Sequence, residues 1–376
     1  MRCSLAACAL LALAAAAPAG APGFRAASPG HRWSFPADHF AHAGYRNEWW
    51  YFTGVLEVEG EPGRRLGYQL TFFRVGILPE APAFASSSAW AAADAVMAHL
   101  AVTDVASGEH LFAEVLWRAA GPLGGFGRPP EGPIAWARAP AGDEGRWSVG
   151  LEDGAFVLSA RDRRQGLGIS LRAVPSRPVA LQGPDGLSRK SRQEGYASLY
   201  ASVTRLATEG TVTLGGRPLR VRGTSWMDHE FGSSQLAPDQ VGWDWLALRL
   251  VDGRDLMVYA LRRADGATSF AYATLVGRDG AVRVLAEDAW SVRARGTWRS
   301  AASGATYPSG WDVSVPGEGV TLVVEPEVRE AENRSRLVEG LSYWEGPVRA
   351  LDAQGRPAGE GYVELTGYGE RSRPPI

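Results

Sequence analysis

Apolar and polar positions along the chain change in short runs, and no long stretch shows the three-to-four-residue repeat that marks an amphipathic helix. The clearest strand signal is the aromatic and β-branched run at residues 48–58, which a Gly/Pro/Arg turn separates from a second run at 66–75. These two runs predict a hairpin. Further short runs follow at residues 97–105, 111–117, 146–151, 155–160, 168–173, 198–207, 211–214 and 219–226. Regularly spaced strands without long helices between them predict an all-β sandwich or barrel.

The second part of the chain repeats the first. Residues 243–248 parallel 49–52, and residues 255–262 parallel 67–74. Two later segments also align in the same order, so the pattern predicts a duplicated β domain. We divide the chain into a signal peptide at 1–19, a lead-in at 20–44, a first β domain with long loop insertions at 45–232, a linker at 233–240 and a second β domain at 241–376.

The first residues have the pattern of a targeting segment. Arg2 precedes an apolar run at residues 5–17, and Ala17-Pro18-Ala19 offers an A-x-A-like cleavage site. We therefore expect an exported protein, periplasmic or secreted. Both cysteines lie inside this segment, so we expect no thiol, disulfide or Cys-ligated metal after cleavage. No later run reaches the roughly 20 apolar residues of a membrane span.

Composition narrows the choice of partners. The 39 basic and 41 acidic residues nearly cancel to a formal charge of -2, which disfavours nucleic acid and anionic membranes as partners. The 14 tryptophans suit the wall of an apolar pocket for a lipophilic small molecule. Lys190 is the single lysine among the basic residues, which we attribute to genome base composition.

The main candidate for chemistry is the run Asp228, His229 and Glu230, framed by Trp226 and Phe231. Burial among aromatic rings raises a carboxyl pKa, so one of these acids could be held protonated and deliver a proton to a carbon–carbon double bond. His229 could then activate water. Two alternatives stay open: in one the polar run is a hydrogen-bonded junction between domains, and in the other the pocket only binds an apolar ligand.

Two further acids stand beside tryptophans. Glu48 directly precedes a Trp-Trp pair and is a second candidate polar group in a pocket. Asp244 lies between Trp243 and Trp245, so in a strand it points to the face opposite the two rings. We rank Asp244 below Asp228 for this reason.

Other kinds of site have weaker signals. Asp38, His39 and His42 could be metal ligands, but no third cluster with ligand spacing follows, so we predict no metal site. The sequence has no G-x-S-x-G, no Walker loop and no G-x-G-x-x-G between a strand and a helix. We therefore set aside serine hydrolases and nucleotide folds and expect no cofactor.

Several motifs together carry a family resemblance. They are E-W-W-Y-F-T-G-x-L at residues 48–56, W-M-D-H-E-F-G at 226–232, G-W-D-W-L-A-L-R-L at 242–250, and Y-W-E-G-P-V through G-Y-V-E-L-T-G-Y at 343–368. In this order they resemble the carotenoid 1,2-hydratase and AttH-like family. The resemblance implies two tandem lipocalin-like antiparallel β-barrels of the calycin type. It also implies apolar ligands: the hydratase branch adds water to terminal double bonds of acyclic carotenoids, and the AttH-like branch is exported and often accompanies an export-type ABC transporter.

The resemblance places the family's Asp-His motif at Asp228 and His229 and its aromatic strand at Trp243 and Trp245. The predicted catalytic residues are Asp228, His229 and Glu230. The predicted ligand-binding residues are Glu48, Trp49, Trp50, Tyr51, Trp226, Trp243, Trp245, Tyr259, Tyr343 and Trp344.

The chain departs from the hydratase pattern in two places. Phe231 stands where a Trp follows the motif His, and Ala260 and Leu261 stand where an acid follows the Tyr of the next strand. These departures weaken the case for a proton donor but leave an apolar pocket intact. Our leading hypothesis is therefore an exported protein that binds or hands over a lipophilic molecule, with an ABC transporter permease as a possible partner. The alternative is a cofactor-free hydratase or lyase that adds water to an isoprenoid double bond.

Overall fold

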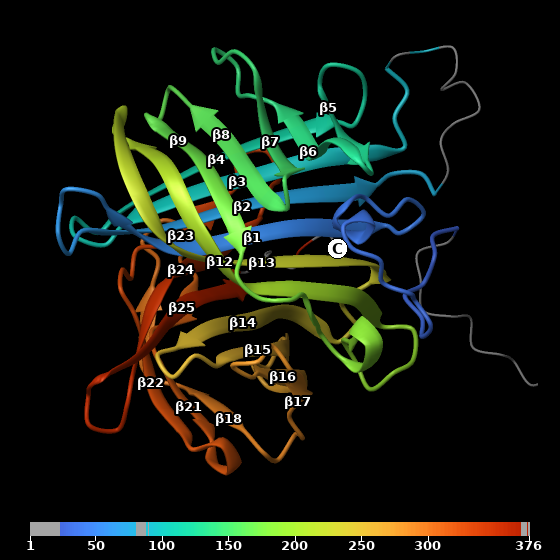
Figure 1. Cartoon of the computed structure of the whole chain (residues 1–376). Helices are drawn as coiled ribbons and strands as arrows, with labels where there is room; N and C mark the ends of the chain where they lie inside the picture. The colour runs from blue at the N-terminus through green and yellow to red at the C-terminus, as the bar shows by residue number, and fades with distance from the viewer. Residues whose placement is uncertain (1–22, 80–87, 89, 370–373, 375–376) are drawn as a thin grey trace, which may run out of the picture.

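The computed structural model describes residues 23–79, 88, 90–369 and 374, and the predicted signal peptide at 1–19 lies outside them. The described chain forms two large curled antiparallel sheets, with only short 3-10 turns such as η1 (Ala37–His39) beside the strands. The predicted all-β architecture of two lipocalin-like units is thus confirmed. Figure 1 shows the sheets stacked, with β1, β12 and β13 near the junction with β14 and β25. No helix among the described residues is long and apolar enough to cross a membrane.

The first sheet runs in the order β4-β3-β2-β1-β13-β12-β9-β8-β7-β6-β5, with β10 and β11 paired to β12. Its strands are β1 (Asn47–Val58), β2 (Arg65–Gly76), β3 (Asp94–Asp104), β4 (Glu109–Arg118), β5 (Gly124–Arg128), β6 (Glu131–Arg138), β7 (Arg146–Glu152), β8 (Ala155–Asp162), β9 (Leu167–Pro175), β10 (Ala180–Leu181), β11 (Leu187–Arg189), β12 (Ala197–Leu214) and β13 (Arg217–Ser234).

The second sheet runs in the order β17-β16-β15-β14-β25-β24-β22-β21-β18, with β23 paired to β24. Its strands are β14 (Gln240–Leu250), β15 (Asp255–Arg263), β16 (Thr268–Val276), β17 (Val282–Val284), β18 (Ser291–Ala294), β21 (Trp311–Val315), β22 (Val320–Pro326), β23 (Glu332–Arg334), β24 (Ser342–Leu351) and β25 (Pro357–Thr366); β19 (Thr297–Arg299) and β20 (Thr306–Pro308) form a separate pair.

The central strands of the two sheets have the same topology. In the first sheet the order is β3-β2-β1-β13-β12, and in the second it is β16-β15-β14-β25-β24. The repeated segments of the sequence occupy matching places, since β1 corresponds to β14 and β2 to β15. The chain leaves the first sheet at Ser234 and enters the second at Gln240.

Each sheet curls around its own apolar core. Trp50, Phe52 and Trp147 belong to the core of the first sheet, and Trp311 and Trp344 to that of the second. A third apolar cluster draws its side chains from both sheets, including Tyr51, Tyr200, Trp226, Trp245, Tyr259 and Tyr362. Successive side chains of a strand point to opposite faces. Alternate residues of β1 and β13 therefore pack in the core of the first sheet, and the residues between them pack in the third cluster.

Polar contacts and close packing also join the two sheets. Arg65 of β2 pairs with Glu327 and Glu360 of the second unit at 2.5 and 2.7 Å. A Cβ on Gly67 would lie 2.8 Å from Cγ of Pro347, so this approach of β2 to β24 requires a glycine. A fully buried carboxylate at the junction, that of Asp255 on β15, accepts hydrogen bonds from Arg177, Arg205 and Thr204 of the first unit at 2.8–2.9 Å.

Replacing Asp255 by Asn should destabilise the protein by about 3–5 kcal/mol, because two guanidinium groups at the junction lose a fully buried partner. Asp252→Asn is the matched control, since Asp252 is a third exposed and, among the residues that the structure describes, forms an ion pair only with Arg254; this change should cost at most about 1 kcal/mol. Urea unfolding of both variants measures the difference. Equal effects of the two substitutions would show that the Asp255 contact does not hold the sheets together.

Candidate active site

A cavity of about 300 Å³ lies between the sheets, walled by the third apolar cluster. Strands β1, β2, β3 and β13 contribute one wall, and β14, β15, β24 and β25 contribute the other. We call it the inter-sheet pocket. The predicted site residues that line it are Trp49, Tyr51, Asp228, Glu230, Trp243, Trp245, Tyr259 and Tyr343. The remaining lining is largely apolar and includes Phe73, Val75, Met97, Leu116 and Leu261.

The predicted Asp228-His229-Glu230 cluster is not one group in space. Asp228 and Glu230 line the inter-sheet pocket, whereas His229 points to the other face of β13. There the ring of His229 stacks on Trp50 at 4.9 Å, and its Nε2 lies 2.9 Å from Oε1 of Glu48. The period of two along a strand separates neighbours in this way. His229 therefore cannot activate water beside Asp228, and that part of the prediction is corrected.

The same alternation removes three predicted ligand-binding residues from the pocket. Glu48 and Trp50 lie on the face of β1 opposite Trp49 and are fully buried there. Trp344 packs in the core of the second sheet, and its Nε1 donates to the carbonyl of Arg329 at 2.7 Å. These three residues are corrected from ligand contacts to structural ones.

Trp226 and Asp244, which the sequence analysis also considered, do not line the inter-sheet pocket. Trp226 lies behind the pocket wall, on the same face of β13 as Asp228, and its Nε1 donates to Asp228 Oδ1 at 2.7 Å. Asp244 points away from Trp243 and Trp245, as the alternation predicted, and it pairs with Arg262 at 2.7 Å.

Asp228 is a buried acid held by neutral donors. Ser202 and Trp226 donate to its Oδ1 at 2.5 and 2.7 Å, and Tyr200 donates to its Oδ2 at 2.6 Å. Burial raises the pKa of Asp228 to about 7, although the three hydrogen bonds offset part of this effect. The three donors leave one acceptor position on Oδ2, where a proton can reside. Asp228 can thus exchange a proton with a pocket ligand near neutral pH.

The partners of Asp228 are themselves oriented. Ser202 Oγ lies 2.9 Å from Gln182 Nε2, which can only donate, and Tyr200 Oη accepts from Trp245 Nε1 at 3.3 Å. Each hydroxyl must therefore turn its own proton toward Asp228. This arrangement fixes the acid without placing an opposite charge next to it.

The sequence analysis missed a second acid of the pocket, Glu364. Burial raises the pKa of Glu364 to about 7, against hydrogen bonds from Thr366 and Trp243 that lower it, while the charges of Asp228 and Glu230 raise it further. Glu364 lies within the quoted motif G-Y-V-E-L-T-G-Y, and its spacing of two from Thr366 was a signal for the same face.

Lys190 was also missed. Its Nζ lies 2.6 Å from Glu230 Oε1 and over the rings of Tyr259 and Tyr200, at 4.4 and 5.1 Å from their centroids. A lone lysine among so many arginines was the available signal, which we had assigned to base composition.

The two departures from the hydratase pattern fall on different faces. Phe231 points away from the pocket and stacks on His42 at 3.7 Å, so the exchange of Trp for Phe leaves the pocket unchanged. Ala260 shares that outward orientation, whereas Leu261 lines the pocket. Only the missing acid therefore alters the pocket wall, and Glu364 supplies a carboxyl from β25.

Comparison with known proteins identifies the family to which the chain belongs. The AttH-like family matches residues 26–368, and the chain belongs to this family. A crystal structure described as an AttH from Nitrosomonas europaea is 32% identical, covers 92% of this chain and 100% of its own, and has a TM-score of 0.77. Kievitone hydratase from Nectria haematococca shares the fold, with a TM-score of 0.63 at 12% identity over 89% of this chain and 92% of its own. No functionally curated protein matches the sequence.

The raised pKa of Asp228 leads us to expect that the free energy of unfolding depends on pH. Because burial lifts this pKa from 3.8 to about 7, the folded protein holds a proton that the unfolded chain releases between these values. The contribution of Asp228 is therefore fully present below about pH 4 and is lost as the pH rises through about 7. The free energy of unfolding of the wild type, minus that of Asp228→Asn, should fall between pH 5 and pH 8 by roughly 1–3 kcal/mol. A difference that stays constant over this range would contradict the assignment.

Proposed function

We propose that the protein is a cofactor-free hydratase or lyase that adds water to, or removes it from, a carbon–carbon double bond of an apolar substrate in the inter-sheet pocket. The observation that carries this proposal is Asp228, an acid with a pKa of about 7 that faces a cavity with a largely apolar surface. General acid catalysis works best when the pKa of the acid lies near the working pH.

The reaction divides between two acids. Protonated Asp228 delivers its proton to one carbon of the double bond, and a carbocation forms at the other carbon. A water molecule bonds to this cation while ionised Glu364 accepts the proton that the water releases. The net change is addition of one water across the double bond, and one proton must pass from Glu364 back to Asp228 before the next cycle. The reverse sequence dehydrates a tertiary alcohol.

The pocket wall suits the charged intermediate. The rings of Trp49, Trp243 and Trp245 line the cavity, and the faces of aromatic rings stabilise cations. A substrate with a trisubstituted double bond fits this chemistry because its protonation gives a tertiary cation. Lys190 is neutralised by Glu230 at one part of the wall, so it does not place a free positive charge beside the cation.

The hydratase proposal has more support than our leading sequence-based hypothesis of a carrier. A carrier needs the apolar wall but gains nothing from two buried carboxyls that titrate near neutrality, which cost stability as they ionise. The fold shared with kievitone hydratase supports the same choice at the level of architecture. Export and association with an ABC transporter stay predictions from the sequence.

Asp228→Asn should lower turnover by about 100-fold or more, since the amide cannot deliver the proton. It should change substrate affinity by only a few fold. The assay incubates the full chain with acyclic isoprenoid alcohols and with a lipid extract in heavy-oxygen water, and mass spectrometry follows incorporation of the heavy oxygen. Asp244→Asn is the matched control, because it makes the same chemical change on β14 of the second sheet, where the side chain points away from the pocket and pairs with Arg262.

The outcomes separate an enzyme from a carrier. Heavy-oxygen incorporation that needs Asp228 but not Asp244 supports the hydratase. A lipophile that co-purifies at near one per chain and remains unchanged in the wild type would instead support a carrier. Full activity of Asp228→Asn would refute the assigned proton donor.

A further inference from the structure

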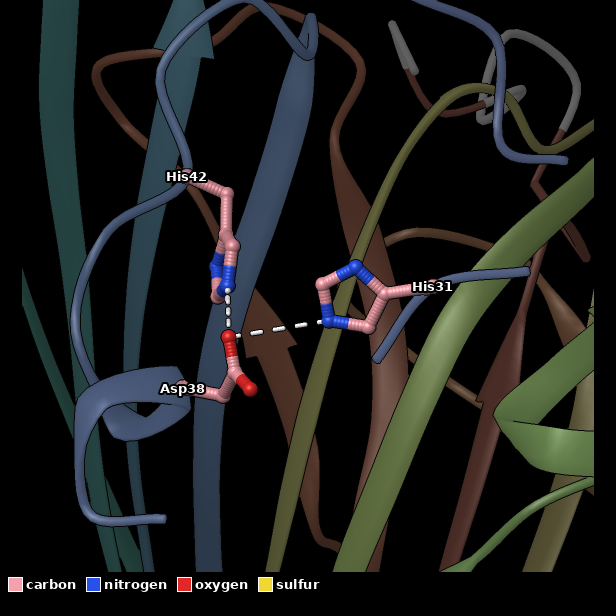
Figure 2. A group of neighbouring side chains, drawn as sticks. All are labelled: His31, Asp38 and His42. Atoms are coloured by element: carbon pink, nitrogen blue, oxygen red, sulfur yellow. Dashed lines mark hydrogen bonds and ion pairs between the residues drawn. The ribbon is translucent and has the colours of Figure 1, made fainter. Parts of the chain in front are cut away.

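A second group of titratable side chains lies outside the inter-sheet pocket, where the lead-in crosses the end of the first sheet. Four of the chain's six histidines gather there, at positions 31, 39, 42 and 229. Figure 2 shows the rings of His31 and His42 approaching the same carboxylate oxygen of Asp38. The hydratase reaction uses none of these residues.

We propose that His31, Asp38 and His42 bind one divalent transition-metal ion, with Zn²⁺ the best match to two imidazoles and a carboxylate. Their ligand atoms all lie within 4.8 Å of one another. His42 Nε2 and His31 Nε2 lie 3.0 and 3.6 Å from Asp38 Oδ1. Two atoms that are each about 2.0–2.1 Å from a tetrahedral Zn²⁺ lie about 3.3 Å apart, which falls between these distances.

His31 supplies an observation that hydrogen bonding alone does not explain. Its Nε2 is buried and has no hydrogen-bond partner among the described residues. The 3.6 Å separation from Asp38 is too long for a hydrogen bond. A metal ion between the two atoms would satisfy both of them. Trp33 and Phe231 pack against the His31 ring, at 4.7 and 5.6 Å between centroids, and so direct it toward the carboxylate.

His42 and Asp38, the other two proposed ligands, each make a second hydrogen bond that orients the ligand atom, as metal ligands in proteins do. Nδ1 of His42 lies 2.8 Å from Oε1 of Glu48, which leaves Nε2 for the ion. Glu48 is fixed in turn by Arg74 and His229, each at 2.9 Å. The second oxygen of Asp38 accepts the backbone N–H of Ser34, so Oδ1 is the oxygen left for the ion.

The local charge also favours a cation. With neutral imidazoles, three carboxylates of the connected cluster, Asp38, Glu48 and Asp94, face one guanidinium, that of Arg74. Two negative charges remain among these four groups, and Arg25 beside Tyr45 brings one positive charge close to His31. The net charge of the cluster stays negative, which favours a bound cation.

The site differs from the metal site considered in the sequence analysis. We had weighed His39 with Asp38 and His42 and predicted no metal. The structure turns His39 into the first sheet, 5.0 Å from the ring of Phe156, and brings His31 from seven residues upstream of Asp38. All three proposed ligands belong to the lead-in, and Glu48 and His229 tie the site to β1 and β13. The ion would therefore fasten the lead-in across the end of the first sheet.

The test is zinc binding by the full chain after chelator treatment, measured by isothermal titration and by metal analysis of the dialysed protein. We expect about one Zn²⁺ per chain. His31→Ala should weaken binding by at least about 10–100-fold, and it changes the most exposed of the three ligands, so folding should persist. His110→Gln is the matched control, because it removes an imidazole that bonds Thr103 and Asn333 in another part of the fold.

Cobalt gives a second readout that a change in folding alone would not produce. Co²⁺ bound by two imidazoles and a carboxylate should give visible absorption that Zn²⁺ displaces, and His31→Ala should lose it. Zinc below about 0.1 per chain in the wild type would overturn the proposal. So would binding that is as tight in His31→Ala as in the wild type and in His110→Gln.

Discussion

The alternation of side chains along β1 and β13 is the constraint on which the rest of the structure depends. Both strands lie in the middle of the first sheet and have no solvent-facing side where their polar residues stand. Even-numbered residues of β13 such as Asp228 face the inter-sheet pocket, and odd-numbered ones such as Met227 and His229 face the interior of the first sheet. Consecutive residues of β13 thus belong to two polar sites, one on each face of the strand. The charge and protonation of each site depend on the residues that contact that face.

Glu48 and Asp228 show how strongly those partners decide the charge. Both carboxyls are almost fully buried on adjoining strands. Burial favours the neutral acid in each case. At Glu48, hydrogen bonds from His229 and His42 and the charge of Arg74 outweigh burial and hold the pKa well below its usual range. At Asp228 the donors are neutral, burial prevails, and the pKa rises to about 7. The first acid is a fixed charge that orients its neighbours, and the second can move a proton.

The architecture could be predicted from the sequence because the strand period, the repeated segments and the family motifs all indicated two similar antiparallel β units. It also placed Trp243 and Trp245 opposite Asp244, since that inference needs only the period of two. The same rule applied to residues 228–230 would have separated His229 from its neighbours. A lone lysine and the spacing of Glu364 from Thr366 were signals in the sequence, but the contact of Lys190 with Glu230 and the place of Glu364 near Asp228 arise from the packing of distant strands, which a local pattern does not predict. His31 depends on the path of an irregular loop, for which no periodicity exists.

The central claim is that Asp228 holds an exchangeable proton near neutral pH inside the inter-sheet pocket. Infrared difference spectroscopy of the wild type against Asp228→Asn observes that carboxyl directly, because a protonated acid and a carboxylate absorb at different frequencies. We predict a protonated-acid band that belongs to Asp228 and disappears with a midpoint at about pH 7. A midpoint near the ordinary aspartate value of about 4 would show an ionised carboxylate at neutral pH and contradict the proton-donor mechanism.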